Sequence, residues 1–307
     1  MFGSKYNYEK FQRERLLNDL AGHRLEGAPR PGDRAPSFEA RTLAGECVNL
    51  KDYRGRKNIV LTFGSATCPQ TAGSLPGLND LYKDRDADVE FFFVYTREAH
   101  PGEKLPAHQS YEDKLKAAEL LREAEGLDIP ILVDDVSGKI HRKYGKLPNP
   151  TFLIDKSGRI AFRSLGTRAS VISKAIDELL EVQRRSGDQH AIVCGGEDLA
   201  LPSPYLLVRA HRALERGGRR SISNFQREMG VPGRMVLAGS RITEPIFENP
   251  AKAAAGALAA ALVLGLGIWG GLALRGKRRA TYHSPYESRA FQRHRFGDPG
   301  DYEAVGI

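Results

Sequence analysis

Cysteine is scarce in this chain, which narrows the chemistry that the sequence allows. The 307 residues include three cysteines, Cys47, Cys68 and Cys194. Three are too few for a disulfide framework. Their spacing also lacks the paired pattern of a zinc site, so we expect no bound metal. The sequence therefore indicates free thiols, which are the default in a reducing compartment.

The N-terminus lacks a long apolar run. Residues Met1 to Leu25 are charged along their length, without the hydrophobic centre of a secretory signal peptide. An uncharged run rich in Ala, Leu and Gly lies instead from Ala253 to Leu274. It has the roughly 20 apolar residues that a bilayer-spanning helix needs, and the basic sequence Arg275-Gly276-Lys277-Arg278-Arg279 follows it, as suits a headgroup region. We expect a single-pass membrane protein.

Two rules disagree on the orientation of this span. The flank after it holds more Lys and Arg than the flank before it, which would place the tail in the cytoplasm. Export of the residues before the span would need a signal peptide, and none is visible. The preceding flank is also basic, with Arg234, Arg241 and Lys252. We therefore expect the residues before the span to lie in the cytoplasm.

The positive charge is uneven along the chain, whose formal net charge is +8. Residues 1–202 carry 30 basic and 30 acidic side chains, whereas residues 203–307 carry 16 and 8. A basic segment predicts contact with an anionic surface, and the adjoining apolar run favours a lipid bilayer over nucleic acid. Small residues recur at Ala253, Ala257, Ala261 and Gly265, a spacing that lets two helices pack as a homodimer.

Strand and helix signals alternate over residues 31–186. Apolar runs predict strands such as Asn58–Phe63 and Val89–Tyr95, and apolar residues on one face predict a helix at Tyr111–Glu125. A hairpin and a final helix follow, so the fold class is α/β, a mixed sheet flanked by helices. The other segments are an N-terminal helix and linker (1–30), an Arg-rich membrane-proximal region (187–250), the transmembrane helix (253–274) and a basic polar tail (275–307). Within the Arg-rich region we predict a helix at 204–216 and recognise no catalytic or binding motif.

One cysteine is distinguished by its context. An apolar strand leads into a small-residue turn and then into Cys68 and Pro69. Proline is favoured in a first helical turn, so we expect Cys68 at a helix N-terminus, where unpaired N–H groups stabilise a thiolate. This predicts an accessible, low-pKa thiol that acts as a nucleophile. The alternative is a small, buried and inert cysteine.

A second segment with candidate site residues follows the strand Val89–Tyr95. Tyr95, Glu98 and His100 lie where that strand ends, and the carboxyl ends of strands line the ligand crevice of α/β sheets. A carboxylate and an imidazole at that position can share proton transfer. The alternative is a solvated loop without a chemical role.

Prolines and hydroxyls supply further candidates. Pro148 and Pro150 precede a predicted strand, where a proline is often cis and shapes a groove. The hydroxyls of Ser65 and Thr67 flank the thiol. Turn hydroxyls also commonly bond to nearby backbone, so both interpretations stay open for this pair.

Together these segments resemble a known family. Phe63-Gly64-Ser65-Ala66-Thr67-Cys68-Pro69 is similar to the selenocysteine motif of the iodothyronine deiodinases, with Cys68 at the selenocysteine position, and Tyr95-Thr96-Arg97-Glu98-Ala99-His100 is similar to their Tyr-Ile-Glu-Glu-Ala-His loop. The resemblance covers residues 31–186 and implies a thioredoxin-like, peroxiredoxin-related fold. It implies Cys68 as nucleophile, Glu98 and His100 as the proton-handling pair, and Ser65 and Thr67 as site hydroxyls. It also implies a halogenated aromatic substrate, an external thioredoxin- or glutathione-like thiol reductant, and no bound cofactor.

Two other functions remain open at this stage. A peroxiredoxin-like peroxidase would use Ser65, which precedes the cysteine by three residues, and a guanidinium for which Arg163 is a candidate by position. Cys194 lies at a distance suited to a resolving thiol and is equally compatible with an inert one. A non-catalytic, membrane-tethered scaffold or redox sensor would keep the fold without turnover.

Overall fold

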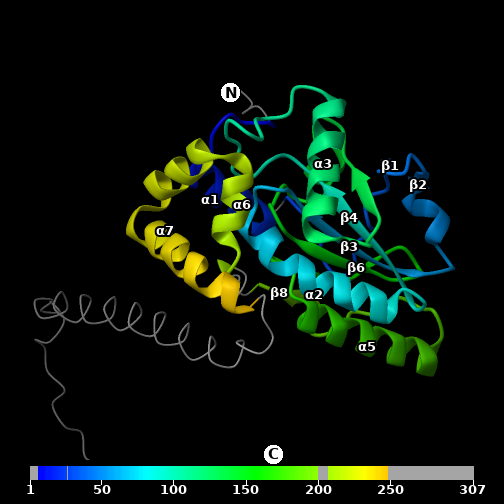
Figure 1. The fold of residues 1–307 in the computed structure, drawn as a ribbon. Coiled ribbons are helices and arrows are strands. Elements are labelled where there is room, and N and C mark those ends of the chain that lie inside the picture. Colours follow the sequence, from blue (N-terminus) through cyan, green and yellow to red (C-terminus); the bar gives the residue numbers. More distant parts are fainter. Residues whose placement is uncertain (1–5, 26, 200–206, 248–307) are drawn as a thin grey trace, which may run out of the picture. The chain divides into compact units, whose positions relative to one another are not determined.

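The computed structural model describes residues 6–25, 27–199 and 207–247, which are coloured in Figure 1. The predicted membrane span (253–274), with its small-residue spacing, and the polar tail (275–307) lie outside the described residues. Within the described ranges, no helix combines the length and the hydropathy needed to cross a bilayer.

Among the described residues, eight strands form one mixed sheet in the order β2-β1-β5-β4-β3-β6-β7-β8. The strands β3, β4 and β5 run parallel, whereas β6 is antiparallel to β3 and forms a hairpin with β7. All seven residues of β3 are buried, as expected for a parallel strand covered on both faces. The strands are β1 (Glu39–Thr42), β2 (Cys47–Asn49), β3 (Asn58–Gly64), β4 (Val89–Tyr95), β5 (Ile131–Val133), β6 (Thr151–Ile154), β7 (Ile160–Ser164) and β8 (Glu197–Asp198).

The two faces of the sheet pack into separate cores because successive strand side chains point in opposite directions. Phe91 and Phe93 of β4 belong to the core under α2, α3 and α5. Phe92 of the same strand and Phe63 of β3 belong to the other core, which Tyr144 closes beside α4. The covering elements are α2 (Pro69–Arg85), α3 (Tyr111–Glu125), α4 (Lys139–Lys143), α5 (Ala169–Ser186) and the 3-10 helix η1 (Leu50–Tyr53).

This connectivity is that of a thioredoxin-like fold. The unit β3-α2-β4 is followed by the hairpin β6-β7 and by α5, and the strands lie in the order β4-β3-β6-β7. The prediction of an α/β fold with a mixed sheet flanked by helices is confirmed. The bounds of β4 and α3 also agree with the predicted ones.

Further helices lie beside the thioredoxin-like unit, on the side away from β1 and β2 in Figure 1. They are α1 (Arg13–Leu25), α6 (Ala210–Gly217) and α7 (Arg219–Phe247). Helix α6 packs against both α2 and α7, and its Arg216 forms an ion pair with Glu125 at the end of α3. Helix α7 bends at Gly230, where φ is 61° and ψ is −140°. The predicted helix at 204–216 overlaps α6, whereas the sequence analysis did not predict α7.

Candidate functional site

Cys68 occupies the N-cap of α2, directly after β3. Its backbone is extended, with φ −85° and ψ 117°, and the helix begins at the next residue. The turn requires glycine at position 64, because a Cβ there would lie 2.5 Å from the Phe93 ring and 2.6 Å from Thr71 Oγ1. The backbone N–H of Cys68 donates to the carbonyl of Ser65 at 3.2 Å. The sequence therefore places this thiol at the end of the sheet, as predicted.

The thiol itself is buried, which corrects the expectation of an accessible, low-pKa group. Cys68 is 2% exposed. Burial raises the pKa of its thiol, and hydrogen bonds from Thr71 and from the backbone of Gln70, which lower it, do not offset that effect. The prediction was wrong because a helix N-terminus contributes about 2 kcal/mol at most, whereas full burial of an anion costs more.

Glu98 lies at the centre of a buried hydrogen-bond network. Its Oε2 accepts from the backbone N–H of Thr67 at 3.0 Å and from the Thr67 hydroxyl at 2.6 Å. Its Oε1 accepts from the hydroxyl of Tyr95, and the same hydroxyl accepts from Ala66 N at 3.2 Å. The side chains at the ends of β3 and β4 are thus joined through one carboxylate.

His108, which is not among the residues predicted from the sequence, completes this network. Its Nε2 lies 3.4 Å from Glu98 Oε1, and neither side chain is more than 3% exposed. Burial alone would raise the pKa of Glu98, but the hydrogen bond and charge of His108, followed by the hydrogen bonds from Thr67 and Tyr95, lower it overall. His108 belongs to no recognisable motif; its position depends on the loop before α3, which the capping box of Ser110 and Asp113 fixes.

His100 lies beside this network and is neutral at physiological pH. Burial lowers its pKa to about 3, against a smaller raising effect of Glu98. Its ring packs against Phe11, with ring centroids 4.2 Å apart, and against Phe225 at 5.2 Å. Its Nδ1 is buried without a hydrogen-bond partner among the described residues. A buried, neutral imidazole of this kind can exchange protons with a neighbouring reactive group.

The two site hydroxyls join the cysteine turn to the loop after β4. Ser65 Oγ accepts from the backbone N–H of Ala99 at 3.1 Å, and Thr67 Oγ1 accepts from that of His100 at 3.0 Å. Two consecutive amides of one loop are therefore held by two hydroxyls of the other. This pairing fixes the relative positions of the thiol, the carboxylate and the imidazole.

The segment before β6 closes a third side of the site. Pro148 contributes to the cavity described below, and the carbonyl of Pro150 accepts from Phe63 N at 3.2 Å. Asn149, between them, donates to the Phe63 carbonyl at 3.1 Å and accepts from Thr167 N at 3.1 Å. Pro150 does not line the cavity, and every peptide bond in the described residues is trans.

A cavity of about 180 Å³ opens beside Cys68. Its walls come from the N-terminal segment, the thioredoxin-like unit and the helices that follow it. Most of the lining side chains are apolar, which suits a ligand with a hydrophobic body. The lining residues are Tyr8, Phe11, Arg15, Leu16, Asp19, Cys68, Pro69, Gln70, Ala99, His100, Pro148, Leu207, Phe225, Met229, Pro232, Gly233 and Val236.

The other candidates from the sequence do not line this cavity. Arg163 is buried and forms an ion pair with Glu197 at 2.7 Å, so it holds β7 to β8. Cys194 donates to Glu178 at 3.2 Å, and burial together with that carboxylate raises its pKa to about 11. Arg163 therefore does not supply the guanidinium that a peroxidase would need beside Cys68.

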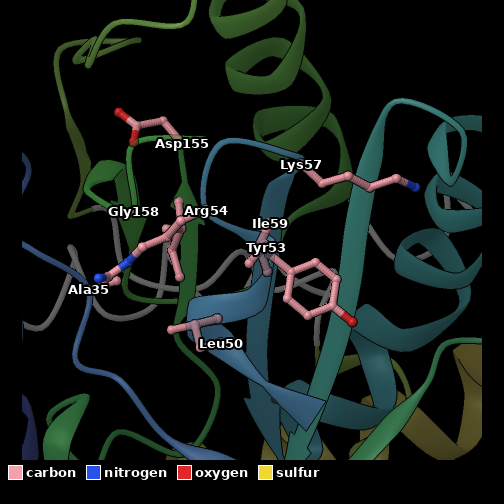
Figure 2. A pocket seen from close by; sticks show the side chains of 9 residues that line it. Ala35, Leu50, Tyr53, Arg54, Lys57, Ile59, Asp155 and Gly158 are labelled. Atoms are coloured by element: carbon pink, nitrogen blue, oxygen red, sulfur yellow. The ribbon is translucent and has the colours of Figure 1, made fainter.

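A second hollow, of about 10 Å³, lies beside η1 and the β6–β7 turn (Figure 2). It has room for about one water molecule, so it is too small for a substrate. In the described part of the chain, no group of three or more His, Cys, Asp and Glu side chains is arranged to hold a metal ion. The cavity at Cys68 is therefore a better candidate for ligand binding than this hollow.

Comparison with known proteins places this site in a family. The sequence profile of the iodothyronine deiodinase family matches residues 16–182. The chain belongs to the iodothyronine deiodinase family. It is 29% identical over 171 residues to type I iodothyronine deiodinase of Xenopus laevis, covering 53% of this chain and 66% of that protein. It is 33% identical over 125 residues to thyroxine 5-deiodinase of Gallus gallus, covering 37% and 48%.

The deiodinase-family match covers only part of this chain and only part of each relative. The aligned residues span between about half and two thirds of these two relatives, and α6 and α7 lie beyond the matched range. Among solved structures, the exposed lipoprotein thioredoxin of Streptococcus pneumoniae is 28% identical, with 47% of this chain and all of that chain covered and a TM-score of 0.36. The thioredoxin domain of a thiol-disulfide oxidoreductase from Bacteroides vulgatus is 19% identical, with 48% and 97% covered and a TM-score of 0.37.

Proposed function

We propose that this protein is a thiol-dependent reductive dehalogenase that removes a halogen from an aromatic ring, with Cys68 as the nucleophile. The observation that carries the proposal is the cavity that Cys68 shares with His100. The cavity is mostly apolar, as an aromatic substrate requires. Membership of the iodothyronine deiodinase family supports the same reaction class.

The first chemical step forms a sulfur–halogen bond. The Cys68 sulfur attacks the halogen, the carbon–halogen bond breaks, and its electron pair stays on the ring carbon. The thiol proton passes to that carbon, so the products are the dehalogenated ring and a sulfenyl halide on Cys68. The substrate carbon is reduced, and the sulfur is oxidised by two electrons.

His100 carries the proton in this step. Its neutral ring lines the same cavity as the thiol, so it can accept the Cys68 proton as the sulfur attacks and donate it to the ring carbon. The nearby carboxylate of Glu98 favours the protonated ring. That carboxylate offsets part, but not all, of the cost that burial imposes on the protonated ring. Glu98, Thr67 and Tyr95 act as positioning residues through their hydrogen bonds.

An external thiol returns the enzyme to its reduced form. A first thiol attacks the sulfenyl halide, releases the halide and a proton, and leaves a mixed disulfide with Cys68. A second thiol then attacks that disulfide and regenerates the Cys68 thiol. A small thiol or a thioredoxin- or glutathione-like protein supplies both, and the reaction needs no bound cofactor. Cys194 is engaged with Glu178, which favours an external reductant over an internal resolving cysteine.

Iodide release from 4-iodophenol in the presence of dithiothreitol tests the proposal. The wild-type chain is expected to release iodide, and Cys68→Ser is expected to abolish release. Cys194→Ser is the matched control, because it removes a thiol that does not line the cavity, and it should keep full activity. Consumption of hydrogen peroxide without iodide release would replace the proposal with a peroxidase. Turnover of neither compound would favour a scaffold or sensor.

We also propose that the chain is anchored in a bilayer through residues 253–274. The support is the sequence: an uncharged apolar run followed by five residues of which four are basic. Resistance to extraction by alkaline carbonate, lost when residues 253–307 are removed, is the expected result. Protease treatment of intact cells tests the expected cytoplasmic orientation, because digestion of residues 6–247 from outside would overturn it.

A further inference from the structure

Some residues that line the cavity beside Cys68 lie within the part of the chain that matches the deiodinase family, and others lie outside it. Cys68, His100 and Pro148 lie within the range that matches the deiodinase family, residues 16–182. Most of the other apolar side chains in the wall lie outside that range. They are Tyr8 and Phe11 before it, and Leu207, Phe225, Met229, Pro232 and Val236 after it. A large part of the apolar wall therefore comes from residues that the family match does not cover.

The part of the wall after the matched range comes from Leu207 and from α7, and buried polar contacts hold α6 and α7 in place. Glu125 is 2% exposed at its side chain and pairs with Arg209 at 2.7 Å as well as with Arg216. Arg216 also donates to the carbonyl of Ala66 at 3.2 Å, two residues before the thiol. Arg212 is a third partner, with its Nε 3.9 Å from the Glu125 carboxylate, and separating a buried carboxylate from its cationic partners is costly. Helix α6 is thus fixed against the cysteine turn.

Helix α7 is fixed at its start in a similar way. Both oxygens of Glu103 accept from its first amides, those of Arg219 at 2.7 Å and Arg220 at 2.9 Å. Further along, Phe225 meets the ring of His100, and Glu228 accepts from the backbone N–H of Arg13 at 3.2 Å. The first half of α7 therefore joins the cavity to the start of α1, as the neighbouring positions of α1 and α7 in Figure 1 illustrate.

The volume of the cavity limits what it can hold. It measures about 180 Å³, close to the roughly 150 Å³ apolar cavity that accepts one benzene molecule. Pockets for drug-sized ligands start at about 300 Å³. The volume matches one aromatic ring with a halogen and is small for two linked rings.

We propose that this cavity selects single-ring halogenated aromatic compounds, and that Met229 and Val236 of α7 set the size limit. This inference rests on the proposed dehalogenase function. A single ring enters with its halogen toward Cys68 and packs its apolar face against α7. Side chains on the opposite face of the same helix, Val231 and Met235, are 60% and 48% exposed and do not line the cavity. They provide a matched valine and a matched methionine for the test.

Binding to the Cys68→Ser chain tests the size limit without turnover. Calorimetry with 4-iodophenol should show binding that Val236→Phe weakens at least tenfold, while Val231→Phe leaves it unchanged. The two-ring compound 4-(4-iodophenoxy)phenol should bind at least tenfold more weakly than 4-iodophenol. Met229→Ala should reduce that difference at least threefold, and Met235→Ala should not alter it. Circular dichroism identifies any variant that fails to fold, and Val236→Leu is the milder substitute for Val236→Phe.

The outcomes separate this inference from the proposed function. Equal binding of the one-ring and two-ring compounds, or unchanged binding in folded Val236→Phe, overturns the size limit. Selective binding of 4-iodophenol without iodide release by the wild-type chain keeps the size limit and overturns the dehalogenase. Iodide release that does not respond to Val236→Phe keeps the dehalogenase and overturns the role of α7.

Discussion

Replacement of Thr67 by valine tests the network that joins the cysteine turn to the loop after β4. The Thr67 side chain is fully buried, and valine has nearly the same shape but no hydroxyl. The substitution removes the 2.6 Å hydrogen bond to Glu98 and the 3.0 Å hydrogen bond from His100 N. The backbone N–H of Thr67 still donates to Glu98, so the carboxylate keeps part of its support.

The expected loss of stability follows from these two contacts. A hydrogen bond to a charged group contributes about 1.5–3 kcal/mol, and a buried N–H left without a partner costs about 1–3 kcal/mol. Their sum predicts a destabilisation of about 2.5–6 kcal/mol, a large fraction of the roughly 5–15 kcal/mol of a typical domain. With a urea m-value of about 3 kcal/mol/M, the unfolding midpoint should fall by about 0.8–2 M.

Thr62→Val is the matched control for this experiment. Thr62 is also buried, but it lies within β3 and its hydroxyl reaches only the Phe92 carbonyl, at 3.4 Å. Its replacement should cost less than about 1 kcal/mol because that contact is long. Urea unfolding of both variants, followed by circular dichroism, gives the comparison. If Thr67→Val is no more destabilising than Thr62→Val, the Glu98 network does not hold the site together.

Further predictions concern the titrating groups. Alkylation of Cys68 by iodoacetamide should have a pH midpoint above that of a free thiol peptide, because burial raises its pKa; a midpoint near 7 would contradict the burial. His100→Ala should lower the rate of iodide release at least about a hundredfold, and it should also lower the unfolding midpoint because the buried ring packs against Phe11 and Phe225; full activity of a folded His100→Phe variant would indicate a structural role only. His23 has a pKa lowered from 6.5 to about 3, chiefly by burial. The folded chain therefore loses stability as the pH falls below 6.5, by about 1.4 kcal/mol per pH unit for this group. His23→Met should remove that part of the slope in urea unfolding between pH 6 and pH 4, and an unchanged slope would show that His23 protonates in the folded state.

The central elements of the fold were predictable because local signals determine them. Strand β4 is one continuous apolar run, and α3 begins at the Ser110 capping box and ends at Gly126, whose φ of 59° is left-handed. Helix α7 was not predictable in the same way. Gly230, Pro232 and Gly233 indicate a break, yet the helical segments continue on both sides of the bend, because packing in the third core cluster, with Phe225 and Leu237, compensates for weak helix propensity.

In the candidate site, too, the features that local sequence signals determine were predictable, and those that depend on long-range packing were not. The rule that strand ends gather at one edge of a sheet was enough to bring Glu98 and His100 toward Cys68. It could not reveal that Phe11 and Phe225, which are far apart in the sequence, pack against His100 and against each other. Those long-range contacts bury the site, and they explain why the thiol is covered rather than accessible. His108 was missed for the same reason, since only the folded loop places it beside Glu98.

A single-turnover experiment tests the central claim most directly. Pre-reduced protein is mixed with excess 4-iodophenol in the absence of any other thiol, and phenol, iodide and the state of Cys68 are measured together. The proposed chemistry predicts one phenol per Cys68, one iodide after the sulfenyl iodide is hydrolysed, and oxidation of Cys68 to a sulfenic acid in the peptide mass spectrum. Formation of phenol while Cys68 remains a reduced thiol would contradict the claim that this sulfur takes the halogen.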